Sequence, residues 1–163
     1  MLISVAVGVT LVTVAAVAVL WFNRGSRLIL DVQIQKVRTQ ALEEQASAMV
    51  IDFRVFNPAD YLYQVRKVDV TLDIGGKTAE GIVIADVDAK RLMEYYPALS
   101  PKYNDTLRMR EKLKPRQSLD RMVAVRFELP ESMVNSRRSL TLRIEEVDGP
   151  VPTVIVHPPA GAR

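Results

Sequence analysis

The feature that most constrains the fold is a repeated alternation of apolar and polar side chains. In residues 65–74, Val68, Val70 and Leu72 are separated from one another by charged or hydroxyl residues. A period of two places alternate side chains on opposite faces of a β-strand. The same pattern predicts strands over residues 30–38, 49–57, 77–87, 122–129, 139–147 and 153–156. Short strands with one apolar face are typical of antiparallel sandwiches, whereas parallel α/β sheets have continuously apolar strands.

Turn-forming residues separate these predicted strands. Asn57-Pro58 ends one strand, because proline cannot donate to a ladder and the Asn57 side chain can bond to nearby backbone. Gly75-Gly76 predicts a tight hairpin, and Gly81 predicts a bulge or a close approach. We therefore predict a mostly β chain whose domain, residues 30–157, is an immunoglobulin-like antiparallel β-sandwich. Without cysteine and without a core tryptophan, it is not a true immunoglobulin domain.

Residues 88–118 interrupt the strand pattern and predict a short helical insert. Asp88 is a candidate N-cap for a helix that continues to Tyr96, where Pro97 stops it. A second short helix is predicted over residues 105–114. Residues 41–48 are polar and are interpreted as a loop or a helical turn.

An uncharged apolar run fills residues 2–22. As a helix it would be about 31 Å long, which matches the roughly 30 Å hydrocarbon core of a bilayer. Trp21 and Phe22 stand where interfacial aromatic anchors are expected. We predict an N-terminal transmembrane helix over residues 1–23, which would make the chain a single-pass protein of the cell membrane with the lipid bilayer as a partner.

The flanks of this run give only a weak orientation signal. Arg24 and Arg27 follow the apolar residues, within a juxtamembrane linker at residues 24–29. The positive-inside rule then favours a cytoplasmic domain, and a translocated domain is the alternative. At the other end, the Pro/Gly/Ala composition of residues 158–163 predicts a disordered tail.

Residues that carry chemistry are scarce. There is no cysteine, and the one histidine, His157, follows the last predicted strand. No dinucleotide or phosphate-loop motif is present, and Gly75–Thr78 lies in a hairpin rather than before a helix. Asp69, Asp73, Asp86 and Asp88 are interpreted as solvated carboxylates rather than a calcium site. We predict a protein that is not an enzyme, with no catalytic residues, cofactor, metal or small-molecule substrate, and no nucleic acid partner.

A basic segment within the insert is the strongest candidate for interaction. Residues 102–121 carry a larger net positive charge than the +3 of the whole chain. Tyrosines in the loop after Asn-Pro and in the insert would add aromatic surface if both meet at one end of the sandwich. The candidate interaction residues are Arg108, Arg110, Lys112, Lys114, Arg116, Tyr61, Tyr63, Tyr95 and Tyr96. The insert is expected to bind a protein, to bind anionic lipid, or only to pack on the sandwich.

The stretch FRVFNPADYLYQVRKVDVTLDIGG resembles the LEA type 2 family, which includes the WHy (water stress and hypersensitive response) domains. The matching residues are Phe53, Val55, Asn57, Pro58, Val65, Val68, Val70, Leu72, Gly75, Gly76 and Gly81. The resemblance covers residues 30–87, and residues 121–147 only in strand pattern. Ala59 replaces the second asparagine that often follows Asn-Pro, and the insert departs from the family. The resemblance implies a small β-sandwich without catalytic residues, linked to stress or desiccation tolerance.

Two functions are therefore expected from the sequence. The first is a non-enzymatic, membrane-anchored β-sandwich that acts by protein or membrane-surface interaction, for example as an accessory subunit of a membrane complex. The alternative is a stress-protective module of the LEA/WHy kind. The sequence names neither the partner nor the oligomeric state.

Overall fold

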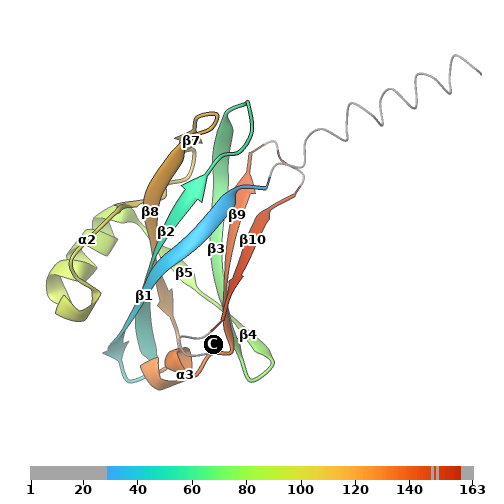
Figure 1. The fold of residues 1–163 in the computed structure, drawn as a ribbon. Coiled ribbons are helices and arrows are strands. Elements are labelled where there is room, and N and C mark those ends of the chain that lie inside the picture. Colours follow the sequence, from blue (N-terminus) through green and yellow to red (C-terminus); the bar gives the residue numbers. More distant parts are fainter. Residues whose placement is uncertain (1–28, 148, 150, 159–163) are drawn as a thin grey trace, which may run out of the picture.

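Two five-stranded sheets face each other in the computed structural model, which describes residues 29–147, 149 and 151–158 (Figure 1). The strands are β1 (Asp31–Glu43), β2 (Ala46–Phe56), β3 (Tyr63–Ile74), β4 (Lys77–Glu80), β5 (Ile82–Ile84), β6 (Asp105–Thr106), β7 (Lys112–Leu113), β8 (Ser118–Phe127), β9 (Ser139–Glu146) and β10 (Thr153–His157). The helices of this part are α2 (Asp86–Tyr95) and α3 (Glu131–Asn135), with a 3₁₀ turn η1 (Pro97–Leu99).

The strand order is β1-β2-β8-β5 in the first sheet and β10-β9-β3-β4 in the second. Beyond these paths, β6 pairs with β8 and β7 pairs with β3. All pairs are antiparallel except β6 with β8. The antiparallel two-sheet sandwich of the prediction is confirmed. His157, expected to follow the last strand, is instead the last residue of β10.

The main core lies between the sheets, and it is formed by the alternating apolar residues that predicted the strands. Phe53 of β2, Leu72 of β3 and Phe127 of β8 are fully buried there. Burying a side chain of this size contributes about 1.5–3 kcal/mol. The inward face of each strand therefore supplies most of the stabilising apolar contact.

The predicted N-terminal transmembrane helix is not supported. No helix in the described part of the chain has the length and apolar character needed to cross a membrane. Residues 2–22, on which the prediction rested, lie outside the described residues.

Two local predictions within the insert and the first hairpin are also wrong. Residues 41–48 are neither loop nor helical turn, because β1 and β2 continue through them to a tight turn. Residues 105–114 are not helical; they contain the short strands β6 and β7. Helix α3 was not predicted, because its five residues are too few to display a helical apolar period.

Residues 77–87 are not one strand, because the chain changes sheets at Gly81. Strand β4 pairs with β3, and β5 pairs with β8. Gly81 N–H donates to the Val70 carbonyl at 2.9 Å. A Cβ at Gly81 would lie 2.2 Å from Val125 Cγ1, so only glycine fits without displacing the core. The predicted close approach is confirmed.

A second change of sheet follows between β6 and β7. Strand β6 lies on β8, in line with β5, whereas β7 lies on β3, in line with β4. Each sheet is therefore bordered on this side by two short segments instead of one continuous edge strand. The two crossings, at Gly81 and at residues 107–111, frame an opening between the sheets.

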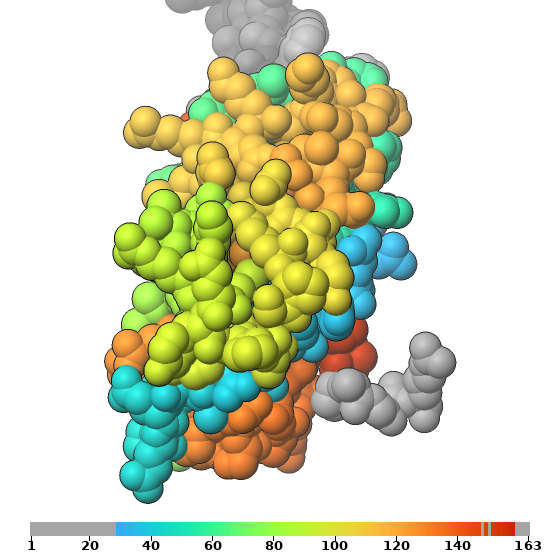
Figure 2. All heavy atoms as spheres, turned by 90° about the vertical axis from the view of Figure 1, so that its left-hand side faces the viewer, coloured from blue at the N-terminus to red at the C-terminus, as the bar shows by residue number. Residues whose placement is uncertain are grey.

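Strand β2 is buried on both faces for most of its length. Its inward residues join the main core, while Ala48 and Val50 face outward with Ala124 of β8. Helix α2 and η1 cover them, contributing Ala89, Met93 and Leu99. In Figure 2 the segment from α2 onward (yellow-green to yellow) lies over this outer face. The first part of the predicted insert thus has a packing role.

Candidate interaction site

The insert is fastened to the first sheet by a buried ion pair. Arg38 of β1 and Asp52 of β2 lie 2.7 Å apart, with side chains only 7% and 3% exposed. The Arg38 guanidinium also donates to the carbonyls of Leu99 and Pro101. Asn104 donates to the other Asp52 oxygen at 3.0 Å. A buried charge needs such partners to offset its desolvation, so the cluster fixes the path of residues 99–104.

A second cluster is centred on Asp86, at the start of α2. Its carboxylate accepts from Lys102 at 2.9 Å, Thr106 at 2.7 Å and Arg108 at 2.7 Å. These donors, Lys102 and Thr106 above all, hold the pKa of the Asp86 carboxyl well below its usual range. The positive charge of Arg108 is thus partly neutralised.

Two consecutive turns follow, on either side of β7. In the first, Glu111 N–H donates to the Arg108 carbonyl at 3.2 Å, and Arg110 has φ of 64°. In the second, Gln117 N–H donates to the Lys114 carbonyl at 3.2 Å, and Arg116 has φ of 56°. The third position of such a turn normally favours glycine.

Each turn is closed a second time by the side chain of its fourth residue. Glu111 Oε2 accepts from Arg108 N–H at 3.1 Å, and Gln117 Oε1 accepts from Lys114 N–H at 2.9 Å. A left-handed arginine costs about 1–2 kcal/mol of backbone strain. Arg110 and Arg116 adopt this conformation despite the cost. Strained backbone conformations of this kind concentrate at functional sites.

The Asn57 side chain links this segment to the loop after β2, which explains why asparagine stands at the end of that strand. The Asn57 side chain is fully buried and donates to the carbonyls of Tyr61, Leu113 and Lys114. Its oxygen accepts from Ala59 N–H at 3.1 Å. The asparagine therefore closes its own loop and clamps β7 beside it, as the adjoining turquoise and gold segments of Figure 2 show.

Arg110, Lys112 and Lys114 form what we call the cation row. All three are exposed, and no ion pair within the described residues neutralises them. The acidic neighbours are already engaged, because Glu111 pairs with Arg121 at 2.7 Å and Asp60 pairs with Arg116 at 3.0 Å. Lys112 lies in β7, and Arg110 and Lys114 lie in the turns on either side of it. The row therefore presents three neighbouring positive charges that no described carboxylate neutralises.

The structure divides the predicted tyrosines among three places. Tyr63 is fully buried, with its hydroxyl 3.4 Å from the Ile144 carbonyl, and cannot form part of an interaction surface. Burial raises the pKa of the Tyr63 hydroxyl. Tyr61 is 42% exposed in the loop beside Lys114.

Tyr95 and Tyr96 do not join the cation row. They end α2 in an edge-to-face contact with ring centroids 4.9 Å apart. The Tyr96 hydroxyl reaches the Leu42 carbonyl near the β1–β2 turn, whereas Tyr61 follows the other end of β2. The two tyrosine groups therefore do not meet at one end of the sandwich.

The predicted anchor residues Trp21, Phe22, Arg24 and Arg27 lie outside the described residues. Conversely, sequence reasoning missed Arg66, an exposed cation within a β3 bulge beside Val65. Val65 N–H donates to Glu111 and its carbonyl accepts from Arg110 N–H. No local signal marks Arg66, because its neighbourhood depends on the β3–β7 pairing.

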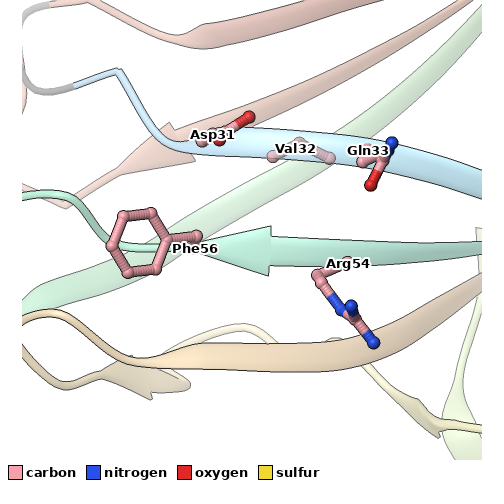
Figure 3. A pocket seen from close by; sticks show the side chains of 5 residues that line it. All are labelled: Asp31, Val32, Gln33, Arg54 and Phe56. Carbon is pink, nitrogen blue, oxygen red and sulfur yellow. The ribbon is translucent and has the colours of Figure 1, made fainter.

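Two shallow pockets lie on the outer face of the first sheet. One, of about 280 Å³, is lined by residues of β1 and β2 (Figure 3). Its single cation, Arg54, points away toward β8 and pairs with Asp120 at 2.7 Å. The other, of about 570 Å³, exposes Lys36 and Tyr103, and the Asp52 carboxylate in its wall is already paired with Arg38. Asp31 also lines the first pocket, and Lys36 of the second lies 4.8 Å from the centre of the Tyr103 ring.

The opening between the two crossings, which we call the side window, is a groove of about 590 Å³. It is lined by residues 67–69 of β3, Gly81, residues 83–86 and residues 106–109. Val83 is 38% exposed and Met109 is 71% exposed at this groove. Among the described residues, no group of three acidic, histidine or cysteine side chains has an arrangement that could hold a metal ion.

Comparison with protein-family models and with curated proteins finds no match. Among solved structures, the chain is similar to a functionally unknown protein from Listeria monocytogenes EGD-e, known from its crystal structure. The two share 8% sequence identity over 82% of this chain and 78% of that chain, with a TM-score of 0.45. A likeness at this level carries no functional argument, and the resemblance to the LEA type 2 family stays a prediction.

Proposed function

We propose that this chain is a non-enzymatic binding module that recognises an acidic segment of a partner protein through the cation row. The observation that carries the proposal is the set of exposed cations on β7 and its turns that no described carboxylate pairs with. Structural arginines elsewhere in the insert are paired with carboxylates, whereas these side chains are free to meet external negative charge. Complementary charge steers association and sets its salt dependence.

The surroundings of the cation row support a rigid site. Asn57 and the two doubly closed turns hold β7 from both ends. Tyr61 and Leu62, 42% and 44% exposed, offer apolar contact beside the row. Charged groups rimmed by aromatic and aliphatic surface are typical of protein interfaces. An accessory subunit of a larger assembly would use such a site.

A charge-reversal experiment tests this function. The triple variant Arg110→Glu/Lys112→Glu/Lys114→Glu is compared with a matched control, Lys77→Glu/Lys90→Glu/Arg138→Glu, which reverses three exposed cations elsewhere. Fluorescent polyglutamate is the defined probe, and proteins that co-purify at stoichiometric level are compared between the variants. We expect the row variant to lose polyglutamate binding and its partner, and the control to keep both. Equal binding by the two variants contradicts the proposal.

A further inference from the structure

The cation row leads directly to the side window. Met109 lines the window and occupies the first turn, next to Arg110. Across the opening, Lys67 and Val68 of β3 follow Arg66. An acidic segment lying along the row would therefore have an apolar groove at one end.

The β3 wall of the window has an unused edge. Val70 O accepts from Gly81 N–H on the side of β3 that faces away from β9. Alternate residues of a strand direct their backbone groups to the same side, so Val68 also directs its N–H and C=O there. Pairing with β4 begins only at Thr71, and pairing with β7 ends at Gln64. Within the described residues, no backbone group bonds to Val68 on this side.

Backbone polar groups in folded proteins are almost always paired with protein or water. An unused donor and acceptor on one strand residue, next to exposed apolar side chains, matches what an extended peptide supplies. Lipid headgroups offer neither a backbone donor nor an alternating side-chain pattern. Stacked bases would need an aromatic platform, and no aromatic residue lines this groove.

We infer that the side window takes an extended segment of the partner protein, which pairs its backbone with Val68 and inserts one apolar side chain between Val83 and Met109. Acidic residues of the same segment then lie along the cation row. This inference rests on the proposed function and adds the chemistry of the ligand, an acidic extended peptide with one apolar anchor.

The probe is a short fluorescent peptide in which glutamate alternates with leucine, with a serine-for-leucine peptide as its comparison. Met109→Asp is the window variant, and Val87→Asp is its control, because Val87 is similarly exposed, at 64%, but lies outside the window. We expect Met109→Asp and the serine peptide each to weaken binding about tenfold, as for the loss of one anchoring side chain. Val87→Asp is expected to bind like the unmodified protein.

Backbone pairing is tested separately, because a merely apolar contact would not need it. Methylation of alternate peptide nitrogens removes donors from one edge of the extended peptide. We expect one of the two alternating methylation patterns to weaken binding and the other to have no effect. Hydrogen exchange at the Val68 amide is expected to slow when the peptide is bound.

Several outcomes overturn the inference. They are full binding by Met109→Asp, equal effects of both methylation patterns, and unchanged exchange at Val68. If binding depends on the cation row but not on Met109, the window inference fails while the proposed function stands. If anionic phospholipid vesicles bind with the same dependence on Met109 and the row, the occupant is a lipid and the inference is wrong.

Discussion

The two halves of the insert use charge in opposite ways. In the first half, residues 86–106, Asp86 binds Lys102, and the buried Arg38–Asp52 pair of the first sheet binds the Pro101 carbonyl and the Asn104 side chain, which holds the segment on that sheet. In the second half, residues 107–117, Arg110, Lys112 and Lys114 face solvent without partners among the described residues. Paired charges there are structural, whereas unpaired charges on a clamped segment are available for binding. Variants of the first half should change stability, and variants of the second half should change binding.

The largest expected effect is at the buried pair. Arg38→Ala leaves the Asp52 carboxylate buried with Asn104 as its remaining side-chain partner. Removing one member of a buried ion pair costs about 3–5 kcal/mol, which urea denaturation would measure. Arg54→Ala removes the exposed Arg54–Asp120 pair and is the control, with an expected cost of about 0–1 kcal/mol. Equal losses of unfolding free energy in both variants would contradict a special anchoring role for the buried ion pair.

The second-largest expected effect is the loss of stability at acidic pH through Asp86. Because the folded pKa of Asp86 is depressed, its ionised form stabilises the fold above the unfolded pKa of about 4. This contribution is lost as the pH falls below that value toward the folded pKa. Asp86→Asn should therefore lower stability at neutral pH and flatten its decline in acid. Asp88→Asn, at an exposed position on the same helix, is the control. An unchanged acid slope in Asp86→Asn would contradict this role.

The smallest change in stability is expected in the two turns. Arg110→Gly and Arg116→Gly relieve left-handed strain of about 1–2 kcal/mol per residue, against about 0.5–1 kcal/mol of added chain entropy for glycine. Thermal unfolding should show no loss, or a gain of up to about 1 kcal/mol. Only Arg110→Gly removes a member of the cation row, so it alone should weaken polyglutamate binding. A clear loss of stability in either variant would mean that these arginines serve the fold.

The alternation of apolar residues was sufficient to predict the sandwich because the inward face of each strand must be buried whatever its partner. Residues 65–74 and 139–147 were therefore located to within a few residues. The insert was predicted less well. Residues 105–114 carry a partial helical apolar face, but pairing of Thr106 with Met122 and of Leu113 with Tyr63 holds both ends of the segment extended. Tertiary pairing overrides a weak local preference.

Of the candidate site, the basic composition of residues 102–121 was visible in the sequence, and Arg110, Lys112 and Lys114 are exposed as a binding role requires. Which cations stay unpaired was not visible, because Arg108, Arg116 and Arg121 find carboxylates that are distant in sequence or on other elements. Tyr63 could not be distinguished from Tyr61, since only the packing of the sheets buries one and exposes the other.

The sequence by itself determined the strand faces, the hairpin at Gly75-Gly76 and the strand end at Asn57-Pro58. These are local consequences of side-chain alternation and backbone sterics. Tertiary structure alone decided the two changes of sheet, the side window between them, and the division of cations into paired and free. Those features depend on which distant groups meet, and the free energy of a charge is set by its surroundings rather than by its neighbours in the chain.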